Sequence, residues 1–140
     1  LTLAKANAEL NGVSKKFRFE QAKVFDTLEK LIGAGEQFET VILDPPKMTR
    51  HRAGIKQAMR GYFSLNRMAV DLLPPGGLIV TCSCSGLITR ENFEEMLNTV
   101  SIRSGRMIQI LETRGQSPDH PTSVHCYNTE YLKCYICRVV

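Results

Sequence analysis

Two short segments of the chain combine residue types that suit chemistry. Residues 44–47 read DPPK and residues 81–86 read TCSCSG, and each segment comes at the end of an apolar run. Because prolines fix φ and remove backbone donors, the first segment is predicted to be a rigid loop whose carboxylate and carbonyl groups can bind a planar heterocycle. A thiol in the second segment, close to cations and to a helix N-terminus, can form a nucleophilic thiolate. The alternatives are a plain turn after a strand and a pair of small buried cysteines.

Between Asp44 and Asp71 the chain has six cations and no acidic residue. The six are Lys47, Arg50, Arg52, Lys56, Arg60 and Arg67. Their number exceeds the formal net charge of the whole chain, which is +4, so the basicity is local. Uncompensated cations beside a base-sized loop favour contact with an RNA or DNA backbone. A solvated helix face is the other interpretation of such a run.

The chain has 140 residues and five cysteines. An odd number of cysteines in a chain long enough to bury a core favours free thiols in a reducing compartment, so we expect a cytoplasmic protein. We predict no metal site, because a zinc site built from Cys82, Cys84, Cys134 and Cys137 would need strand positions i and i+3, which point to opposite faces. The sequence has no apolar run long enough to cross a membrane, and we expect no membrane partner.

Helices and strands are predicted to alternate along the chain. Helical spacing covers 3–10, 26–33, 53–73 and the segment after Thr89, and strand patterns cover 17–24, 38–43, 78–83, 107–112 and 131–140. This order indicates one α/β doubly wound sheet, in which ligands bind at the C-terminal ends of the strands. The DPPK and TCSCSG segments lie at two such ends.

These motifs resemble those of a known enzyme family. DPPK, the RGYFSLN segment, a PPGG turn, SCSG, the tripeptide Asp119-His120-Pro121 and the closing EYLKCYICRV resemble the class I large-subunit ribosomal RNA methyltransferases, which depend on S-adenosylmethionine and methylate C5 of cytosine. The resemblance extends over residues 7–140. It implies a Rossmann-like class I methyltransferase sheet with helices on both faces.

The resemblance also implies parts that this sequence does not contain. Family members have two earlier strands, a Gly-rich cofactor loop and an N-terminal RNA-binding domain. We therefore expect residues 1–140 to be the C-terminal portion of one catalytic domain, and we expect this chain by itself neither to bind S-adenosylmethionine tightly nor to methylate. Ribosomal RNA is the implied partner, and the oligomeric state is open, a homodimer included.

The family's site residues map onto individual positions. By resemblance, Cys84 adds as a thiolate to C6 of the base, and Asp44 binds the N3 and N4 edge. The cofactor is expected at Asp44, at Pro45 and at the end of the FRFEQAKV segment, where Lys23 replaces the family's aspartate, so the backbone around Val24 is the better candidate. The residues expected to contact RNA are Pro46, Lys47, Arg50, Arg52, Lys56, Arg60, Tyr62 and His120.

Either cysteine of TCSCSG could be the nucleophile, and we predict that it is Cys84, with Cys82 as a buried structural thiol. Cys84 is close to Gly86, which permits a sharp exit from the strand. It also lies nearer than Cys82 to the Glu91-Asn92 pair, as in RNA cytosine methyltransferases. Two other functions stay open: a DPP-type methyltransferase acting on a base nitrogen, in which Cys84 only packs in the core, and a non-catalytic RNA-binding remnant.

Overall fold

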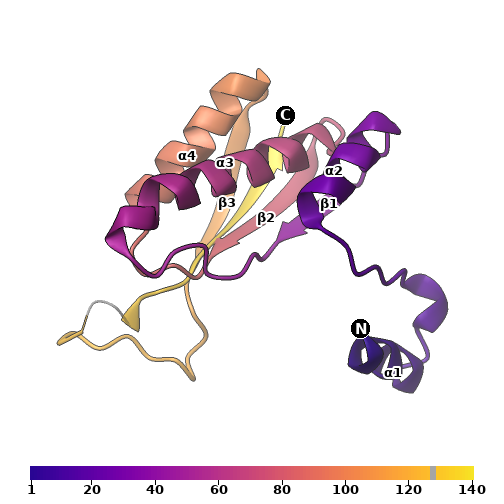
Figure 1. Ribbon diagram of the computed structural model, residues 1–140, viewed down its shortest axis with the longest axis horizontal. Coiled ribbons are helices and arrows are strands. Elements are labelled where there is room, and N and C mark those ends of the chain that lie inside the picture. The colour runs from indigo at the N-terminus through magenta and orange to yellow at the C-terminus, as the bar shows by residue number, and fades with distance from the viewer. Residues whose placement is uncertain (127–128) are drawn as a thin grey trace.

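A computed structural model describes residues 1–126 and 129–140 of the chain. Its centre is a four-stranded sheet in the order β1-β2-β4-β3. The strands are β1 (Thr40–Leu43), β2 (Gly77–Ser83), β3 (Ile108–Arg114) and β4 (Lys133–Val139). β1 runs parallel to β2, whereas β4 is antiparallel to both of its neighbours, β2 and β3. The C-terminal ends of β1, β2 and β3 and the start of β4 therefore meet at one edge of the sheet (Figure 1).

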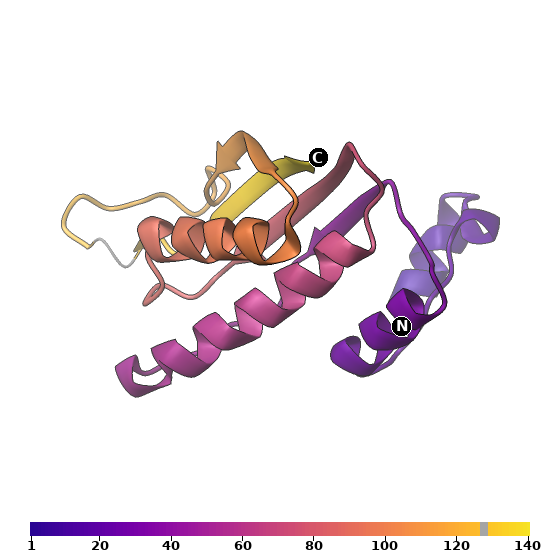
Figure 2. The ribbon, with the colours of Figure 1, turned by 90° about the horizontal axis from the view of Figure 1, so that it is seen from above.

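Three helices form a layer on one face of this sheet. The helices of the chain are α1 (Thr2–Leu10), α2 (Val24–Gly33), α3 (Ile55–Asp71) and α4 (Arg90–Ser104), with short 3₁₀ turns at Ser14–Lys16 and Arg52–Gly54. Figure 2 shows α2, α3 and α4 below the strands, and Figure 1 shows α1 apart from the other elements. The α/β class is confirmed. The expectation of helices on both faces is met on one face only within the described residues.

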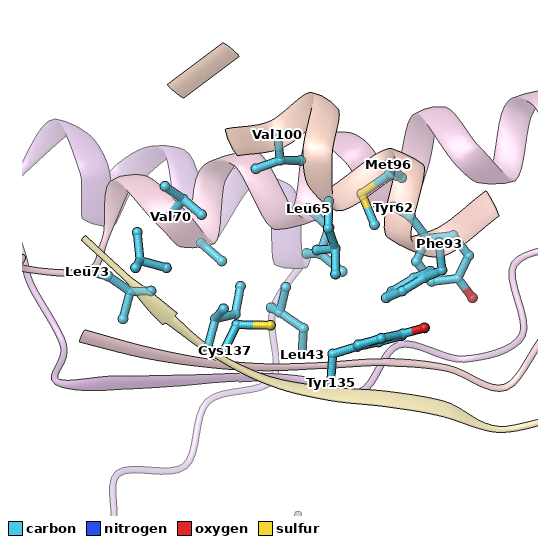
Figure 3. Packing of buried hydrophobic residues seen from close by; sticks show 14 of the residues in the cluster. Leu43, Tyr62, Leu65, Val70, Leu73, Phe93, Met96, Val100, Tyr135 and Cys137 are labelled. Atoms are coloured by element: carbon cyan, nitrogen blue, oxygen red, sulfur yellow. The ribbon is translucent and has the colours of Figure 1, made fainter. Parts of the chain in front are cut away.

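The core lies between this helix layer and the sheet, and its centre is aromatic. The Tyr62 ring of α3 meets the Phe93 ring of α4 edge-on at a centroid distance of 5.3 Å, and Phe93 stacks on Tyr135 of β4 at 5.7 Å (Figure 3). All three rings are fully buried. Such aromatic pairs add a geometric preference to the burial of apolar surface, so they fix how α3 and α4 sit above β4.

The opposite face of the sheet is only partly covered. Ile42, Val80 and Ile136 lie next to one another across β1, β2 and β4. Ile42 is 69% exposed, and the other two are partly exposed. Alternate residues of a strand point to opposite faces, so the same strands bury one set of side chains and present the other.

The strand predicted for residues 17–24 is wrong. These residues are extended but pair with no strand, and Lys23 directly precedes α2, which begins at Val24. An isolated strand is unstable without a hydrogen-bonded neighbour, so an alternating pattern alone does not make one. The helix predicted for residues 26–33 is present but begins two residues earlier, at Val24, and its N-cap, Lys23, makes no side-chain cap hydrogen bond.

The helix predicted after Thr89 is confirmed. The Asn92 amide donates to the Thr89 hydroxyl at 3.2 Å, and the Thr89 amide donates to the Asn92 side chain at 3.4 Å. This reciprocal capping box satisfies backbone donors that the first helical turn leaves free. Gly105, at φ 67°, ends the helix in a left-handed conformation that favours glycine.

Among the described residues, no helix has both the length and the apolar character needed to cross a membrane.

Candidate active site

The two motifs come together at the edge of the sheet where the strands end. β2 ends at Ser83, so Cys84 is the first residue beyond it, and Asp44 is the first residue beyond β1. The Cys84 thiol lies 3.9 Å from the carbonyl oxygen of Pro45 and donates to it. Cys84 is partly buried, and Asp44 is exposed. The DPPK and TCSCSG segments therefore meet at one site, where the thiol of Cys84 contacts the backbone of the residue that follows Asp44.

A buried hydroxyl network supports Cys84 from below. The Ser83 hydroxyl donates to the Tyr62 hydroxyl at 3.0 Å, and the Tyr62 hydroxyl lies 3.4 Å from that of Ser85. The Ser85 amide donates to the Ser83 hydroxyl at 3.4 Å. Ser83 and Ser85 are both fully buried, so the residues on either side of Cys84 are fixed while Cys84 itself faces outward.

Tyr62 therefore has a different role from the one predicted. It is fully buried on α3, so its side chain is not accessible to an RNA at the surface. A buried tyrosine hydroxyl needs a hydrogen-bond partner, and Tyr62 finds it in the two serines that flank Cys84. The structure corrects the expected RNA contact to a buried support beneath Cys84.

Lys133 is a feature of the site that the sequence analysis missed. It is 3% exposed, and its ammonium group donates to the Ser85 carbonyl at 2.7 Å and to the Tyr131 carbonyl at 2.9 Å. Burial, with the nearby charge of Arg90, lowers the pKa of Lys133 to about 8. Its signal was present in the sequence: Lys133, Tyr135 and Cys137 share the core-facing register of one strand.

Cys82 differs from Cys84 in its surroundings. It lies within β2 directly across from Cys134 of β4. Burial, hydrogen bonding with Cys134 and the charge of Asp44 raise the pKa of Cys82 to about 12, so its thiol is protonated at neutral pH. The expected buried position is only partly met, since Cys82 lies on the less covered face and is partly exposed.

The basic segment lies at the same edge. Among its predicted RNA contacts, the exposed ones are Pro46, Lys47, Arg50, Arg52, Lys56 and Arg60. The loop that carries several of them is shaped by Thr49, whose buried hydroxyl donates to the His51 carbonyl at 2.8 Å and accepts from the His51 amide at 3.3 Å. Arg67 differs from the rest, because it forms an ion pair with Asp71 one helical turn later.

His120 lies in the loop between β3 and β4, which reaches the same edge (Figure 1). Its Nδ1 is 3.2 Å from a carboxylate oxygen of Asp119, and its ring lies 6.4 Å from that of Tyr131 at a steep angle. The hydroxyl of Ser117 and the His120 ring lower the pKa of Asp119. His120 is exposed, so it is available to a ligand, and Tyr131 links its loop to Lys133.

The expected cofactor residues are not all brought together. Pro45 contacts Cys84, and Asp44 directly precedes Pro45 at the end of β1. Lys23 and Val24 lie where the chain enters α2, both exposed, and no hydrogen bond among the described residues joins them to Asp44 or Pro45. Lys23 also lacks the acceptor that an amino group would require.

Comparison with known proteins gives the sequence context of this site. No family model matches the chain. It is 38% identical over 141 residues to a ribosomal RNA large subunit methyltransferase I of Klebsiella pneumoniae, and 40% identical to one of Tolumonas auensis. Each alignment covers 100% of this chain. Its relatives are ribosomal RNA large subunit methyltransferases. The chain spans about a third of their length, 35% and 36% respectively.

Solved structures agree on the fold. A putative SAM-dependent methyltransferase from Streptococcus mutans superposes with a TM-score of 0.70 at 19% identity, over 84% of this chain and 29% of that one. NSun6 from Pyrococcus horikoshii, solved with SFG, gives 0.60 at 16% identity, over 98% and 38%. The four-stranded sheet and its helices thus have the class I methyltransferase fold, which confirms the predicted fold class.

Proposed function

We propose that this chain is part of an S-adenosylmethionine-dependent methyltransferase that acts on C5 of a cytosine in large-subunit ribosomal RNA. The observation that carries the proposal is the thiol of Cys84, placed at the C-terminal end of β2 and in contact with Pro45 of the DPPK loop. Ligands of open α/β sheets bind at this edge. The names of the relatives supply the substrate class, ribosomal RNA.

The chemistry explains why a thiol is needed. C5 of cytosine is a poor nucleophile, and a bond from the Cys84 sulfur to C6 moves electron density to C5. The Asp44 carboxylate can accept a hydrogen bond from the exocyclic amino group and so orient the base. After C5 has gained the methyl group, loss of the C5 proton to a base allows the bond between sulfur and C6 to break. Cys84 leaves as a thiolate, ready for another cycle.

S-adenosylmethionine supplies the methyl group as a sulfonium substituent. The residues present fit one side of such a site: Asp44 is an exposed carboxylate at a strand end, and the two prolines that follow it have carbonyl acceptors but no amide donors. Val24 and Lys23 do not add to that side in this structure. The part of the chain that would hold the cofactor here is therefore the end of β1.

The RNA is expected to enter along the basic segment. Its exposed cations can hold phosphates on the approach to Cys84, and His120 can contribute from the neighbouring loop. A paired cytosine must leave its stack before a side chain can reach C6. We infer a cytoplasmic location, because all five cysteines are free and free thiols are typical of a reducing compartment.

Methyl transfer to large-subunit ribosomal RNA tests the proposal. The complete protein is incubated with labelled S-adenosylmethionine and unmodified RNA, and the RNA is digested to nucleosides. We expect label in 5-methylcytidine, lost in Cys84→Ser and kept in Cys82→Ser. Label on a base nitrogen that survives Cys84→Ser would support the DPP-type alternative and overturn C5 chemistry. No label and no cofactor binding would identify an RNA-binding remnant.

A further inference from the structure

The Lys133 ammonium group lies directly under the turn that carries the nucleophile. It donates to the carbonyl of Ser85, the residue after Cys84, and its second hydrogen bond goes to Tyr131 at the start of β4. An ammonium group has three donors, and these two bonds leave one. Lys133 is 3% exposed, so the charge is held inside the protein and close to Cys84.

We propose that Lys133 is a positioning residue for Cys84, which fixes the turn through the Ser85 carbonyl and places a positive charge where it stabilises the thiolate. This inference rests on the proposed function where it gives Cys84 a catalytic role. The effect of the Lys133 charge on the Cys84 thiol does not depend on that function. A positive charge near a cysteine favours the ionised thiol, and a charge out of water acts more strongly than one at the surface.

Burying an ammonium group is unfavourable, which makes a purely packing role a poor explanation. Desolvation disfavours the charged form, and this cost is visible as the lowered pKa of Lys133, about 8. At neutral pH the group remains mostly protonated. An aliphatic side chain of similar length would fill the same space without that cost, so the charge itself is the property that needs a function.

Other charged groups act on the same region and must be counted. The charges of Arg90 at the start of α4 and of Lys47 in the DPPK loop disfavour the protonated form of Lys133. Glu130 and Cys84 favour the protonated form. Cys82 is protonated at neutral pH, so it adds no charge. Lys133 is the buried cation of this group, while Arg90, Lys47 and Glu130 are partly or fully exposed and are screened by solvent.

The experiment measures the alkylation of Cys84 by iodoacetamide in the full chain between pH 6 and pH 9, read for each cysteine by mass spectrometry. The variants are Lys133→Met, which removes charge and donor, Lys133→Gln, which keeps a donor without the charge, and Lys133→Arg, which keeps both. Lys30→Met on α2, where the lysine is exposed, is the matched control. Circular dichroism checks that each variant is folded.

We expect Lys133→Met and Lys133→Gln to slow the alkylation of Cys84 at pH 7 by about tenfold and to move the half-maximal rate to higher pH, since about one decade corresponds to the loss of one nearby charge. Lys133→Arg and Lys30→Met should keep the wild-type profile within about threefold. Cys126, which is exposed, should react alike in all variants. If Lys133→Met does not fold, Lys133→Gln decides by the same criteria.

An unchanged Cys84 profile in a folded Lys133→Gln protein would overturn the proposal. Slower alkylation of Cys126 to the same extent would also overturn it, because that result would show an effect that is not specific to Cys84. The alkylation needs neither RNA nor cofactor, so the two proposals fail separately. If methyl transfer is absent but the Lys133 variants shift the pH profile of Cys84 alkylation, only the proposed function is rejected. If methyl transfer is normal but that profile does not shift, only the role of Lys133 is rejected.

Discussion

The position of Cys84 depends on residues that are buried beneath it. Its neighbours Ser83 and Ser85 are tied to Tyr62 beneath them, and Ser85 is also tied to Lys133. A nucleophile must be held in one geometry to gain from proximity, and here the fixed atoms are hydroxyls and a carbonyl inside the core. The thiol is left as the group that faces the DPPK loop.

Removing the Tyr62 hydroxyl tests this support. Tyr62→Phe leaves the Ser83 and Ser85 hydroxyls without their partner in a buried site, so we expect the free energy of unfolding to fall by about 1–3 kcal/mol. Tyr135→Phe is the matched control. Its hydroxyl donates to Glu94, whose exposed carboxylate can bind water instead, so a smaller loss is expected. Urea unfolding of both variants decides, and equal losses would contradict the special role of Tyr62.

At the scale of helices and strands, local signals explain what the sequence predicts well. The helix after Thr89 has its cap, its first-turn acid and a left-handed glycine at its end, all of which are readable from the chain. Residues 17–24 have a strand pattern as regular as that of β4. Their pairing depends on neighbouring strands, which no local signal reports, and so the strand prediction fails there.

The candidate site, too, was predicted from the sequence only in part. The positions of Asp44 and Cys84 were predictable because these residues follow two apolar strand segments whose C-terminal ends must meet at one edge. Lys133 was hidden because a lysine in a strand is usually turned to solvent. Tyr62 was expected at the RNA through the family resemblance, whereas helical periodicity turns it toward Phe93.

The cap of α4 gives a prediction about one element. Thr89→Ala removes the acceptor for the Asn92 amide, and we expect the free energy of unfolding to fall by about 1 kcal/mol. Thr89→Ser keeps the hydroxyl and should stay within a few tenths of wild type. Thermal unfolding compares the three proteins. A Thr89→Ser variant as unstable as Thr89→Ala would mean that the threonine methyl group, and not the cap, is what matters.

The basic segment before and within the start of α3 gives a second prediction. Changing Arg50, Arg52 and Lys56 together to Ala should make the plot of log affinity for RNA against log salt shallower by up to about 2.7, because each phosphate contact contributes about 0.9 on a duplex. Arg67→Ala is the control, since this charge is already paired with Asp71. An unaltered slope for the triple variant would reduce the segment to a solvated surface.

For the molecule as a whole, one face of the sheet is covered by helices and the other is partly exposed, and β1 is an edge strand. β1 pairs only with β2 within the described residues, and the face with Ile42 is partly bare. The titration of a buried group is also a property of the whole molecule, because it is coupled to global unfolding. Lys133 is the clearest case in this chain.

The stability of the protein should depend on pH through Lys133. Its pKa is lowered from 10.5 to about 8, so between these pH values the unfolded chain binds more protons and this group favours the folded state increasingly as pH rises. The free energy of unfolding of wild type minus that of Lys133→Met should therefore increase by up to about 3 kcal/mol from pH 7 to pH 10.5.

This difference isolates the contribution of Lys133. The pKa values of Cys82, Tyr135 and Cys137 are raised in the folded protein, so these groups destabilise the folded state as pH rises. They do so equally in wild type and in Lys133→Met, and their contribution cancels. Urea unfolding at several pH values measures the difference. A difference that does not change with pH would show that Lys133 has an ordinary pKa in the folded protein.

The most direct test of the central claim is the trapping of a covalent complex with RNA that contains 5-fluorocytosine, in which C5 has no proton to lose and the Cys84 sulfur stays bound to C6. The complete protein, Cys84→Ala and Cys82→Ala are each incubated with this RNA and S-adenosylmethionine, and the denatured complexes are resolved by electrophoresis. We predict a stable complex for wild type and Cys82→Ala and none for Cys84→Ala. A complex that survives Cys84→Ala, or that disappears only in Cys82→Ala, would contradict the assignment of Cys84 as the nucleophile.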